Sequence, residues 1–131
     1  MILLDTHIWL WLLHDPSQLS SQAQAAIDSE EPQSGLLVSA ISAWEIAIKF
    51  SIGKLTLPLP IDEWYALAQT HSGIIIEPLN PLNAITSTQL PDNFHKDPAD
   101  RILVVIARRY KIPLVTCDAK ILTYPHMQTI W

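Results

Sequence analysis

The sequence has little of what several protein classes depend on. Its one cysteine, Cys117, has no partner for an intrachain disulfide, which indicates a reducing compartment and a cytoplasmic protein. Only three glycines are present, and no phosphate-binding loop or dinucleotide-binding fingerprint is found. The five histidines and the cysteine show no H-x₃-H or C-x₂-C spacing, so a structural zinc site is not expected.

The apolar start of the chain, residues 1–13, predicts neither an export signal nor a membrane helix. It has no basic start and no small-residue cleavage site, and it carries Asp5 and His7. It is also too short to cross a bilayer, so we expect no membrane association. With 131 residues, 49% of them hydrophobic, the chain predicts a single domain over residues 1–131 with a core of its own.

Basic residues are few, and the net charge of −5 argues at first against a nucleic-acid partner. Their distribution is uneven, because six of the eight fall between residues 96 and 120: Lys96, Arg101, Arg108, Arg109, Lys111 and Lys120. A cationic rim around a metal-loaded acidic centre would suit a phosphate backbone. The alternative, basic residues on a solvated helix end, explains the same pattern equally well.

Short apolar segments alternate with helical patterns along the chain. Strands are predicted at 2–4, 36–39, 74–79, 114–117 and 127–131, and helices at 8–13, 19–29, 43–52, 61–71, 81–88 and 98–110. The helix from Pro98 is apolar on nearly every side, so it should be central and buried. The pattern predicts an α/β fold of three layers, with a central, mostly parallel sheet of four to five short strands between helices.

Four acidic residues, Asp5, Glu45, Asp100 and Asp118, stand where strands lead into helices or near helix starts. Each has a structural explanation of its own, since Asp5 and Asp118 suit helix caps and Asp100 suits a first turn. Glu45 completes an S-x-x-E capping box with Ser42. In a parallel sheet, however, all four would meet at the edge formed by the carboxyl ends of the strands.

Such a group of acids needs a cation. Two carboxylates about 5 Å apart repel by roughly 3 kcal/mol at an effective dielectric constant near 20. Hard oxygen ligands in this number suit one or two Mg²⁺ or Mn²⁺ ions. Metals held in this way can activate a water for phosphodiester hydrolysis.

The motifs around these acids are LLDTH (3–7), SAISAWEIAIK (39–49), DPADRIL (97–103) and TCDAKI (116–121). In order and spacing this set closely resembles PIN-domain ribonucleases, in particular the VapC-type toxins of type II toxin–antitoxin systems. The resemblance covers essentially the whole chain. It implies an α/β/α PIN fold in which Asp5, Glu45, Asp100 and Asp118 bind Mg²⁺ or Mn²⁺ and serve endonucleolytic RNA cleavage. It also implies a homodimer and inhibition by a cognate antitoxin. DNA would be contacted only indirectly, through that antitoxin.

Further candidates lie beside the four acids. Asp97 stands three residues before Asp100 across Pro98, and it suits either a metal ligand or a helix cap. Thr6, Ser39 and Thr116 would hydrogen-bond the acids or a bound water. His95 and Arg101 are candidate RNA contacts, although Arg101 would pair equally well with an acid. The tryptophans Trp9, Trp11 and Trp44 suit base stacking, but packing in the core or a dimer is the favoured interpretation.

Two other functions compete with the nuclease. An aspartyl-phosphate phosphatase would use Asp5 as its nucleophile, but the second aspartate that such enzymes carry two residues later is replaced by His7. A non-catalytic interaction module would use the acids only as helix caps and its apolar surface to bind a partner. Tight Mn²⁺ binding would separate the nuclease from such a module.

Overall fold

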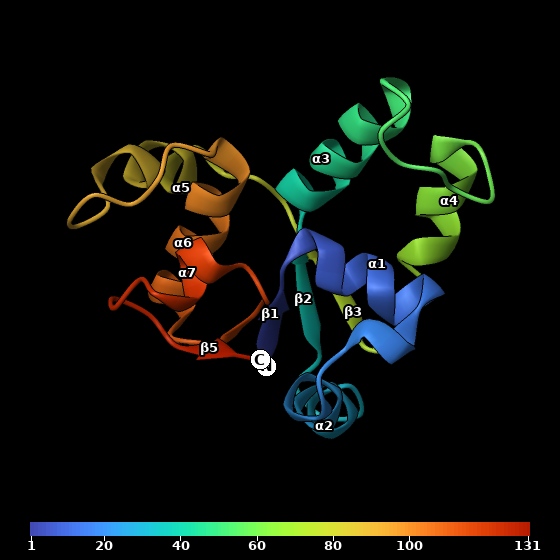
Figure 1. The fold of residues 1–131 in the computed structure, drawn as a ribbon, viewed down its shortest axis with the longest axis horizontal. Helices are drawn as coiled ribbons and strands as arrows, with labels where there is room; N and C mark the ends of the chain where they lie inside the picture. Colours follow the sequence, from blue (N-terminus) through green and yellow to red (C-terminus); the bar gives the residue numbers. More distant parts are fainter.

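The centre of the molecule is a five-stranded, entirely parallel sheet. The structure is a computed structural model that describes residues 1–131. The strands lie in the order β3-β2-β1-β4-β5, with bounds β1 Ile2–Leu4, β2 Leu36–Ser39, β3 Ile74–Glu77, β4 Leu114–Val115 and β5 Thr129–Ile130. Because every pairing is parallel, the carboxyl ends share one edge, at the top of β1 and β2 in Figure 1. The predicted α/β sheet is confirmed.

Helices connect the strands at nearly all the predicted places. Their bounds are α1 Thr6–His14, α2 Ser21–Glu30, α3 Ala40–Ser51, α4 Ile61–Ala68, α5 Pro81–Thr86, α6 Pro98–Tyr110 and α7 Ala119–Leu122, with 3₁₀ turns at Pro16–Gln18 and Ser87–Gln89. The last two strands are shorter than the predicted 114–117 and 127–131. None of the helices is long and apolar enough to cross a membrane.

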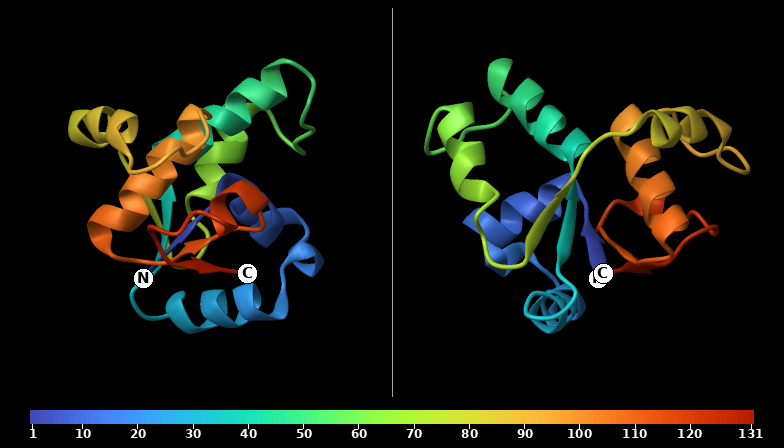
Figure 2. Two further views of the ribbon diagram at one scale, coloured as in Figure 1. Left: turned by 60° about the vertical axis from the view of Figure 1, so that its left-hand side comes forward. Right: turned by 180° about the vertical axis from the view of Figure 1, so that it is seen from behind.

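The strands divide the apolar residues between two cores because successive side chains point to opposite faces of the sheet. Leu3 and Leu37 belong to the core under α6 and α7. Their neighbours Ile2, Leu4 and Leu36 belong to the core under α1, α2 and α4. The three predicted layers are therefore present, as Figures 1 and 2 show from three directions.

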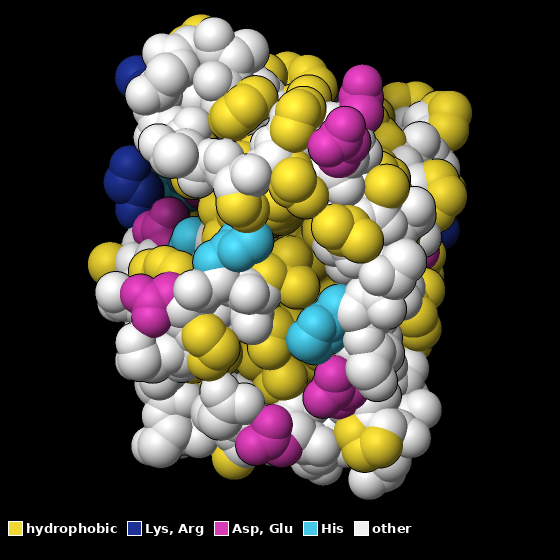
Figure 3. Space-filling view, turned by 90° about the vertical axis from the view of Figure 1, so that its right-hand side faces the viewer, with side chains coloured by type: hydrophobic (Ala, Val, Ile, Leu, Met, Phe, Trp, Pro, Cys, Tyr) yellow, Lys and Arg dark blue, Asp and Glu magenta, His cyan; other side chains and the backbone are white.

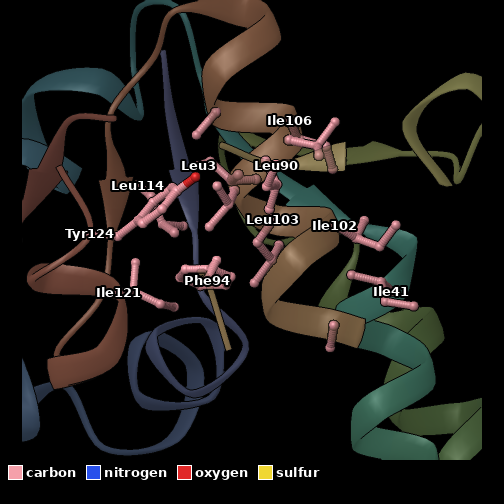
Figure 4. Packing of buried hydrophobic residues seen from close by; sticks show 14 of the residues in the cluster. Leu3, Ile41, Leu90, Phe94, Ile102, Leu103, Ile106, Leu114, Ile121 and Tyr124 are labelled. Atoms are coloured by element: carbon pink, nitrogen blue, oxygen red, sulfur yellow. The ribbon is translucent and has the colours of Figure 1, made fainter. Parts of the chain in front are cut away.

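The helix α6 is buried as predicted and forms the main support of one face. Seven of its residues are buried, from Ala99 to Ala107. Leu103 and Ile106 pack toward Leu3 and Leu114 of the sheet (Figure 4). Burying side chains of this size contributes roughly 1.5–3 kcal/mol each relative to exposure. The start of α6 is thereby fixed against the carboxyl edge of the sheet.

The start of α3 differs from the prediction. The helix begins at Ala40, and its N-cap is Ser39, whose Oγ accepts a hydrogen bond from the Ile41 N–H at 3.1 Å. The predicted capping box of Ser42 and Glu45 is wrong, because β2 passes directly into the helix. Ser42 is instead buried inside the first turn, and Glu45 lies one turn further on. Glu45 is therefore free of any capping role.

Candidate active site

The four predicted acids approach one another at the carboxyl edge of the sheet. Asp5 follows β1 and caps α1, Asp118 follows β4 and caps α7, Glu45 lies on α3 and Asp100 lies in the first turn of α6. The pKa of Asp100 is raised from 3.8 to about 8, and burial is the largest cause. The charges of Asp5, Asp97, Asp118 and Glu45 add to that increase. At neutral pH, Asp100 is therefore mostly protonated in the metal-free protein.

Asp5 is held in one orientation from both sides. Its residue is only 3% exposed, which is rare for a carboxylate. Oδ1 accepts the Thr6 N–H at 2.7 Å, and Oδ2 accepts the Thr116 hydroxyl at 2.7 Å. Both oxygens are thus hydrogen-bonded before any substrate binds, which makes Asp5 a poor candidate for a free nucleophile.

Thr116 connects two of the acids. Besides donating to Asp5, its hydroxyl accepts the Asp118 N–H at 3.1 Å. Thr116 is completely buried, so its bond to Asp5 is shielded from water. The predicted contact between Thr116 and a strand-end acid is present, and it sets the orientation of Asp5 relative to the turn that carries Asp118.

The hydroxyls of Thr6 and Ser39 bond other groups and not the acids, so of their two predicted roles only a bond to a bound water stays a prediction. The Thr6 hydroxyl donates to Ser42 Oγ at 2.9 Å, and Ser39 is occupied as the cap of α3. Thr6 still supports Asp5 through its backbone N–H. The pair of Thr6 and Ser42 joins α1 to α3 and so fixes the helix that carries Glu45.

Asp97 and His95 flank Asp100 in different ways. Asp97 caps α6, since its Oδ1 accepts the Asp100 N–H at 3.1 Å. Its other oxygen remains available, so a role as metal ligand stays a prediction. His95 lies with Nε2 at 3.0 Å from Asp100 Oδ2 and is mostly buried. An RNA contact by His95 also stays a prediction, but the structure places this ring first of all against Asp100.

Arg101 is used to hold the loop before α6. Its Nε donates to the Ser87 carbonyl at 2.8 Å, and its Nη1 donates to the carbonyls of Phe94 and His95 at 2.8 and 3.0 Å. It forms none of the predicted pairs with an acid. The geometry favours a structural role over the predicted contact with RNA.

The predicted cationic rim is only partly present. Arg108, Arg109 and Lys111 lie at the C-terminal end of α6, whereas Asp100 lies at its start. At 1.5 Å per residue the two ends of this helix are more than about 10 Å apart. Arg108 donates to the His126 carbonyl at 2.7 Å, and Arg109 to Asn83 Oδ1 at 2.5 Å. These cations favour the helix C-terminus and do not surround the acids.

Sequence analysis missed three residues at this edge. His7 Nδ1 lies 3.7 Å from Asp5 Oδ2, and His7 Nε2 lies 3.2 Å from Cys117 Sγ. Burial and the charges of Asp5 and Asp118 raise the pKa of the Cys117 thiol. The third is Ser42. All three stand one to three residues from a predicted acid. Their closeness in sequence to these acids is the only signal that could have identified them.

The donor set suits a hard divalent cation, because it consists of carboxylates, and burial together with the charges of the other acids raises the pKa of Asp100. The side chains are not, however, gathered into a ready-made cluster. Nowhere do three or more His, Cys, Asp or Glu side chains stand close enough to hold a metal ion as they lie. The chemistry and charge of these donors therefore suit Mg²⁺ or Mn²⁺, whereas their spacing as they lie does not form a complete site.

Comparisons with known proteins identify relatives of the whole chain. The chain is 32% identical over 132 residues to Ribonuclease VapC22 of Mycobacterium tuberculosis, covering 99% of this chain and 98% of that protein. Among solved structures, VapBC2 of Rickettsia felis bound to a promoter DNA fragment has a TM-score of 0.70 at 13% identity, covering 98% of this chain and 97% of that one. A toxin–antitoxin complex from Klebsiella pneumoniae has a TM-score of 0.63 at 17% identity, covering 96% and 94%.

At these low identities the two structures show a shared fold. The family match is more direct, because the PIN domain covers residues 2–126, a range that includes every acid of the edge. Together with the full-length 32% identity, this places the chain by sequence as well as by fold. The chain belongs to the PIN domain family.

Proposed function

We propose that the protein is a metal-dependent endoribonuclease that acts as the toxin of a toxin–antitoxin pair. The observation that carries the proposal is the convergence of five acidic side chains on one sheet edge, where burial and the charges of the other four raise the pKa of Asp100 to about 8. Capping explains Asp5, Asp97 and Asp118 one by one, but it explains neither Glu45 nor the burial of Asp100. The full-length similarity to a protein named as a ribonuclease supports RNA as the substrate.

Asp5, Glu45, Asp100 and Asp118 would hold one or two Mg²⁺ or Mn²⁺ ions, with Asp97 as a further ligand. A bound ion would supply the acidity that activates a water and the charge that offsets a phosphodiester in the transition state. The protein's own part is orientation and proton balance. Thr116 and the Thr6 N–H orient Asp5. Asp100, whose pKa is raised in the metal-free protein, would release its proton on binding a divalent ion.

The test is cleavage of a total cellular RNA pool with the fragment ends mapped, with Mg²⁺ or Mn²⁺ and with EDTA. The wild type should cut only with metal, and Asp5→Asn purified in parallel should be inactive while keeping its circular dichroism spectrum. Calorimetry with Mn²⁺ adds a readout that does not need activity, and a capping-only module would show no tight binding. Equal cleavage by Asp5→Asn and the wild type would sink the proposal.

The antitoxin needs a surface of its own, and a groove between α1 and α4 is suited to it. The groove encloses about 300 Å³ and includes Leu13, Trp64 and Leu67, the last of these 63% exposed. Apolar side chains gather along the middle of this face in Figure 3. Asp62 and Glu63 on α4 add negative charge nearby, so a basic amphipathic segment would fit.

We also propose that the protein forms a homodimer. Light scattering, which measures the molecular mass in solution, tests this proposal.

Leu67→Glu tests the assignment of the antitoxin to the groove. The variant should cleave RNA at the wild-type rate but resist the antitoxin encoded beside it, because the charge would enter the apolar groove. Leu122→Glu changes an exposed leucine on α7 and serves as the matched control. Inhibition of both variants at the wild-type antitoxin concentration would place the antitoxin elsewhere.

A further inference from the structure

Most lysine and arginine side chains have no acidic partner, although the chain has 13 acidic residues and only eight of these cations. Lys49 is the one that forms an ion pair, with Glu45. The other ion pairs join acids to histidines or to the N-terminal ammonium. Cations that stay unpaired in a negatively charged chain are available to an anionic ligand. The places where they gather therefore indicate where an anion would bind.

Two of these free cations line a hollow at the C-terminal end of α6. Arg108 and Lys111 are on its wall, and the segment 125–128, which leads into β5, forms the other side. The hollow encloses about 550 Å³, and its lining contains no acid. Ile112 and Met127 give it an apolar part. The macrodipole of α6 explains a cation at this end, but it does not explain a hollow that is lined by cations without any acid.

A second hollow, of about 510 Å³, lies beside the start of α6. Its wall includes Lys96, which directly precedes Asp97 of the acid edge. Most of the remaining lining is polar, and Thr88 and Asn93 supply a hydroxyl and an amide that suit a sugar or a phosphate. Arg101 belongs to the lining too, but its donors hold the loop carbonyls. The second hollow therefore brings one free cation next to the acids.

The two hollows meet at one ion pair. Asp92 lines the hollow at the start of α6, and His126 lines the hollow at its end. His126 Nε2 lies 2.6 Å from Asp92 Oδ2, so the only acid in either lining already has a partner. The segment that carries His126 runs beside α6 (Figure 1), and its carbonyl accepts a hydrogen bond from Arg108. The cations Lys96, Arg108 and Lys111 thus form a row, the basic track, which begins beside the acids and follows α6 to its end.

The length of the basic track indicates the kind of anion. Asp100 and Lys111 are 11 residues apart, which is about 16 Å along the helix axis. A single phosphate cannot reach from the acids to Lys111, whereas a strand with a phosphate at every nucleotide can. An acidic protein segment is the other anion of this length. RNA is favoured because the track starts beside the acids at which a phosphodiester would be cleaved.

We infer that the basic track binds the phosphates of the RNA strand that continues from the scissile phosphate, with Lys96 near the cleavage site and Lys111 several nucleotides away. The inference rests on the proposed nuclease function and extends it to the substrate on one side of the cut. The apolar part of the far hollow would accept a sugar or a base. The basic segment expected of an antitoxin would be repelled here.

The test is RNA binding, measured by fluorescence anisotropy in the Asp5→Asn background so that the RNA stays intact. Two labelled single strands are used, one that covers only the cleavage site and one that extends well beyond it on both sides. Mn²⁺ is held constant while KCl is varied. Lys111→Asn removes the far cation, and asparagine tolerates the left-handed conformation of this residue, whose φ is 55°.

For the long RNA, Lys111→Asn should weaken binding about fivefold near 0.1 M salt. The slope of log affinity against log salt should become shallower by about 0.7, the value for one phosphate contact on a single strand. For the short RNA neither quantity should change. Lys96→Ala together with Lys111→Asn should lower the slope for the long RNA by about 1.4, because distant contacts add.

Two controls isolate the charge and its position. Lys111→Arg keeps the charge and should bind the long RNA as the parent does. Lys54→Ala removes a free cation that belongs to neither hollow of the track, and it should leave the slope unchanged. With the active protein, Lys111→Asn should raise KM for the long RNA about fivefold and leave kcat unchanged, because a contact away from the reacting phosphate is equal in the ground and transition states.

An unchanged salt slope in Lys111→Asn, beside normal metal-dependent cleavage, would overturn this inference and leave the nuclease intact. Equal losses in Lys111→Asn and Lys54→Ala would also overturn it, because net charge alone would then explain both. A Lys111→Asn protein that binds RNA as before but needs more antitoxin for inhibition would assign the track to an acidic protein segment. Absence of metal-dependent RNA cleavage by the wild type would overturn the proposed function itself, and this inference with it.

Discussion

The two ends of the sheet differ in how their acidic side chains are paired. At the amino end, the N-terminal ammonium of Met1 lies 2.7 Å from Glu30, and His71 lies 3.2 Å from Glu31. At the carboxyl end, the five acids outnumber their neighbours Lys49, His7 and His95, and burial together with the charges of the other acids raises the pKa of Asp100 to about 8. At the amino end, acidic groups are paired with basic groups of the same chain. At the carboxyl end, acidic groups remain in excess.

That difference separates what the fold needs from what the site needs. Opposite charges at the amino end stabilise the folded chain slightly and require nothing further. Like charges at the carboxyl end oppose folding, and they are tolerated because the cores on both faces of the sheet hold the acids in place. Changes at the two ends should therefore have different consequences.

The largest effect is expected from Asp118→Asn at the carboxyl end. RNA cleavage should fall by about 1,000-fold or more, because an ion held by the acids supplies several kcal/mol of transition-state stabilisation. The unfolding free energy in urea should stay level or rise, since asparagine caps α7 as well as aspartate does and one repulsive charge is gone. A large loss of stability would mean that Asp118 serves the fold and not the site.

Thr116→Val should reduce cleavage by about 10- to 100-fold, because Asp5 loses a hydrogen-bond donor while the side-chain shape is kept. It should also destabilise the fold by about 1–3 kcal/mol, since the buried Asp5 carboxylate loses a donor and the part-buried Asp118 N–H loses its acceptor. Steady-state cleavage and urea unfolding measure the two losses. Thr123→Val is the control, because that hydroxyl bonds only the exposed last turn of α7.

A pH titration of the metal-free protein tests the repulsion directly. The pKa of Asp100 is about 8 when folded, so the folded chain keeps a proton that the unfolded chain releases near pH 4. Stability should therefore fall as pH rises from about 4 to 8, and Asp100→Asn should flatten that slope. Calorimetry at pH 7 in buffers of different ionisation enthalpy should show close to one proton released per site loaded with Mg²⁺. A slope unchanged in Asp100→Asn would remove Asp100 as its source.

The smallest effect belongs to the amino end. Glu30→Gln breaks the ion pair with Met1, whose groups are about one-third exposed. The unfolding free energy should fall by less than about 1 kcal/mol. RNA cleavage should stay at the wild-type rate, because Glu30 lies at the opposite end of the sheet. A clear loss of activity in Glu30→Gln would show that the two ends are coupled.

Much of the fold could be predicted because its signals are local. The β2 strand was predicted with its observed bounds, and the apolar pattern after Pro98 identified α6 and its burial. The meeting of Asp5 and Asp118 at one edge followed from strands being parallel. The start of α3 was predicted wrongly because two serines, Ser39 and Ser42, fit a cap equally well in the sequence, and only the end of β2 decides between them.

The details of the site could not be predicted because they depend on contacts between distant segments. Thr116 and Asp5 are 111 residues apart, and Thr6 and Ser42 are 36 apart. Which partner a hydroxyl chooses depends on sub-ångström placement that no local pattern encodes. Arg101 is similar, since its carbonyl partners in the preceding loop become available only when that loop folds back over α6.

The Cys117 thiol, which lies beside His7, allows a probe to be attached at the carboxyl edge of the sheet. Cys117 is the chain's only cysteine, it is partly exposed, and it precedes Asp118 directly. A maleimide dye or a nitroxide attached there would sit at the acids without any engineered residue. Because the pKa of this thiol is raised, labelling should be slow at pH 7 and faster in alkaline buffer. The label would then report the arrival of metal or RNA through its spectrum, in a protein that needs no background cysteines removed.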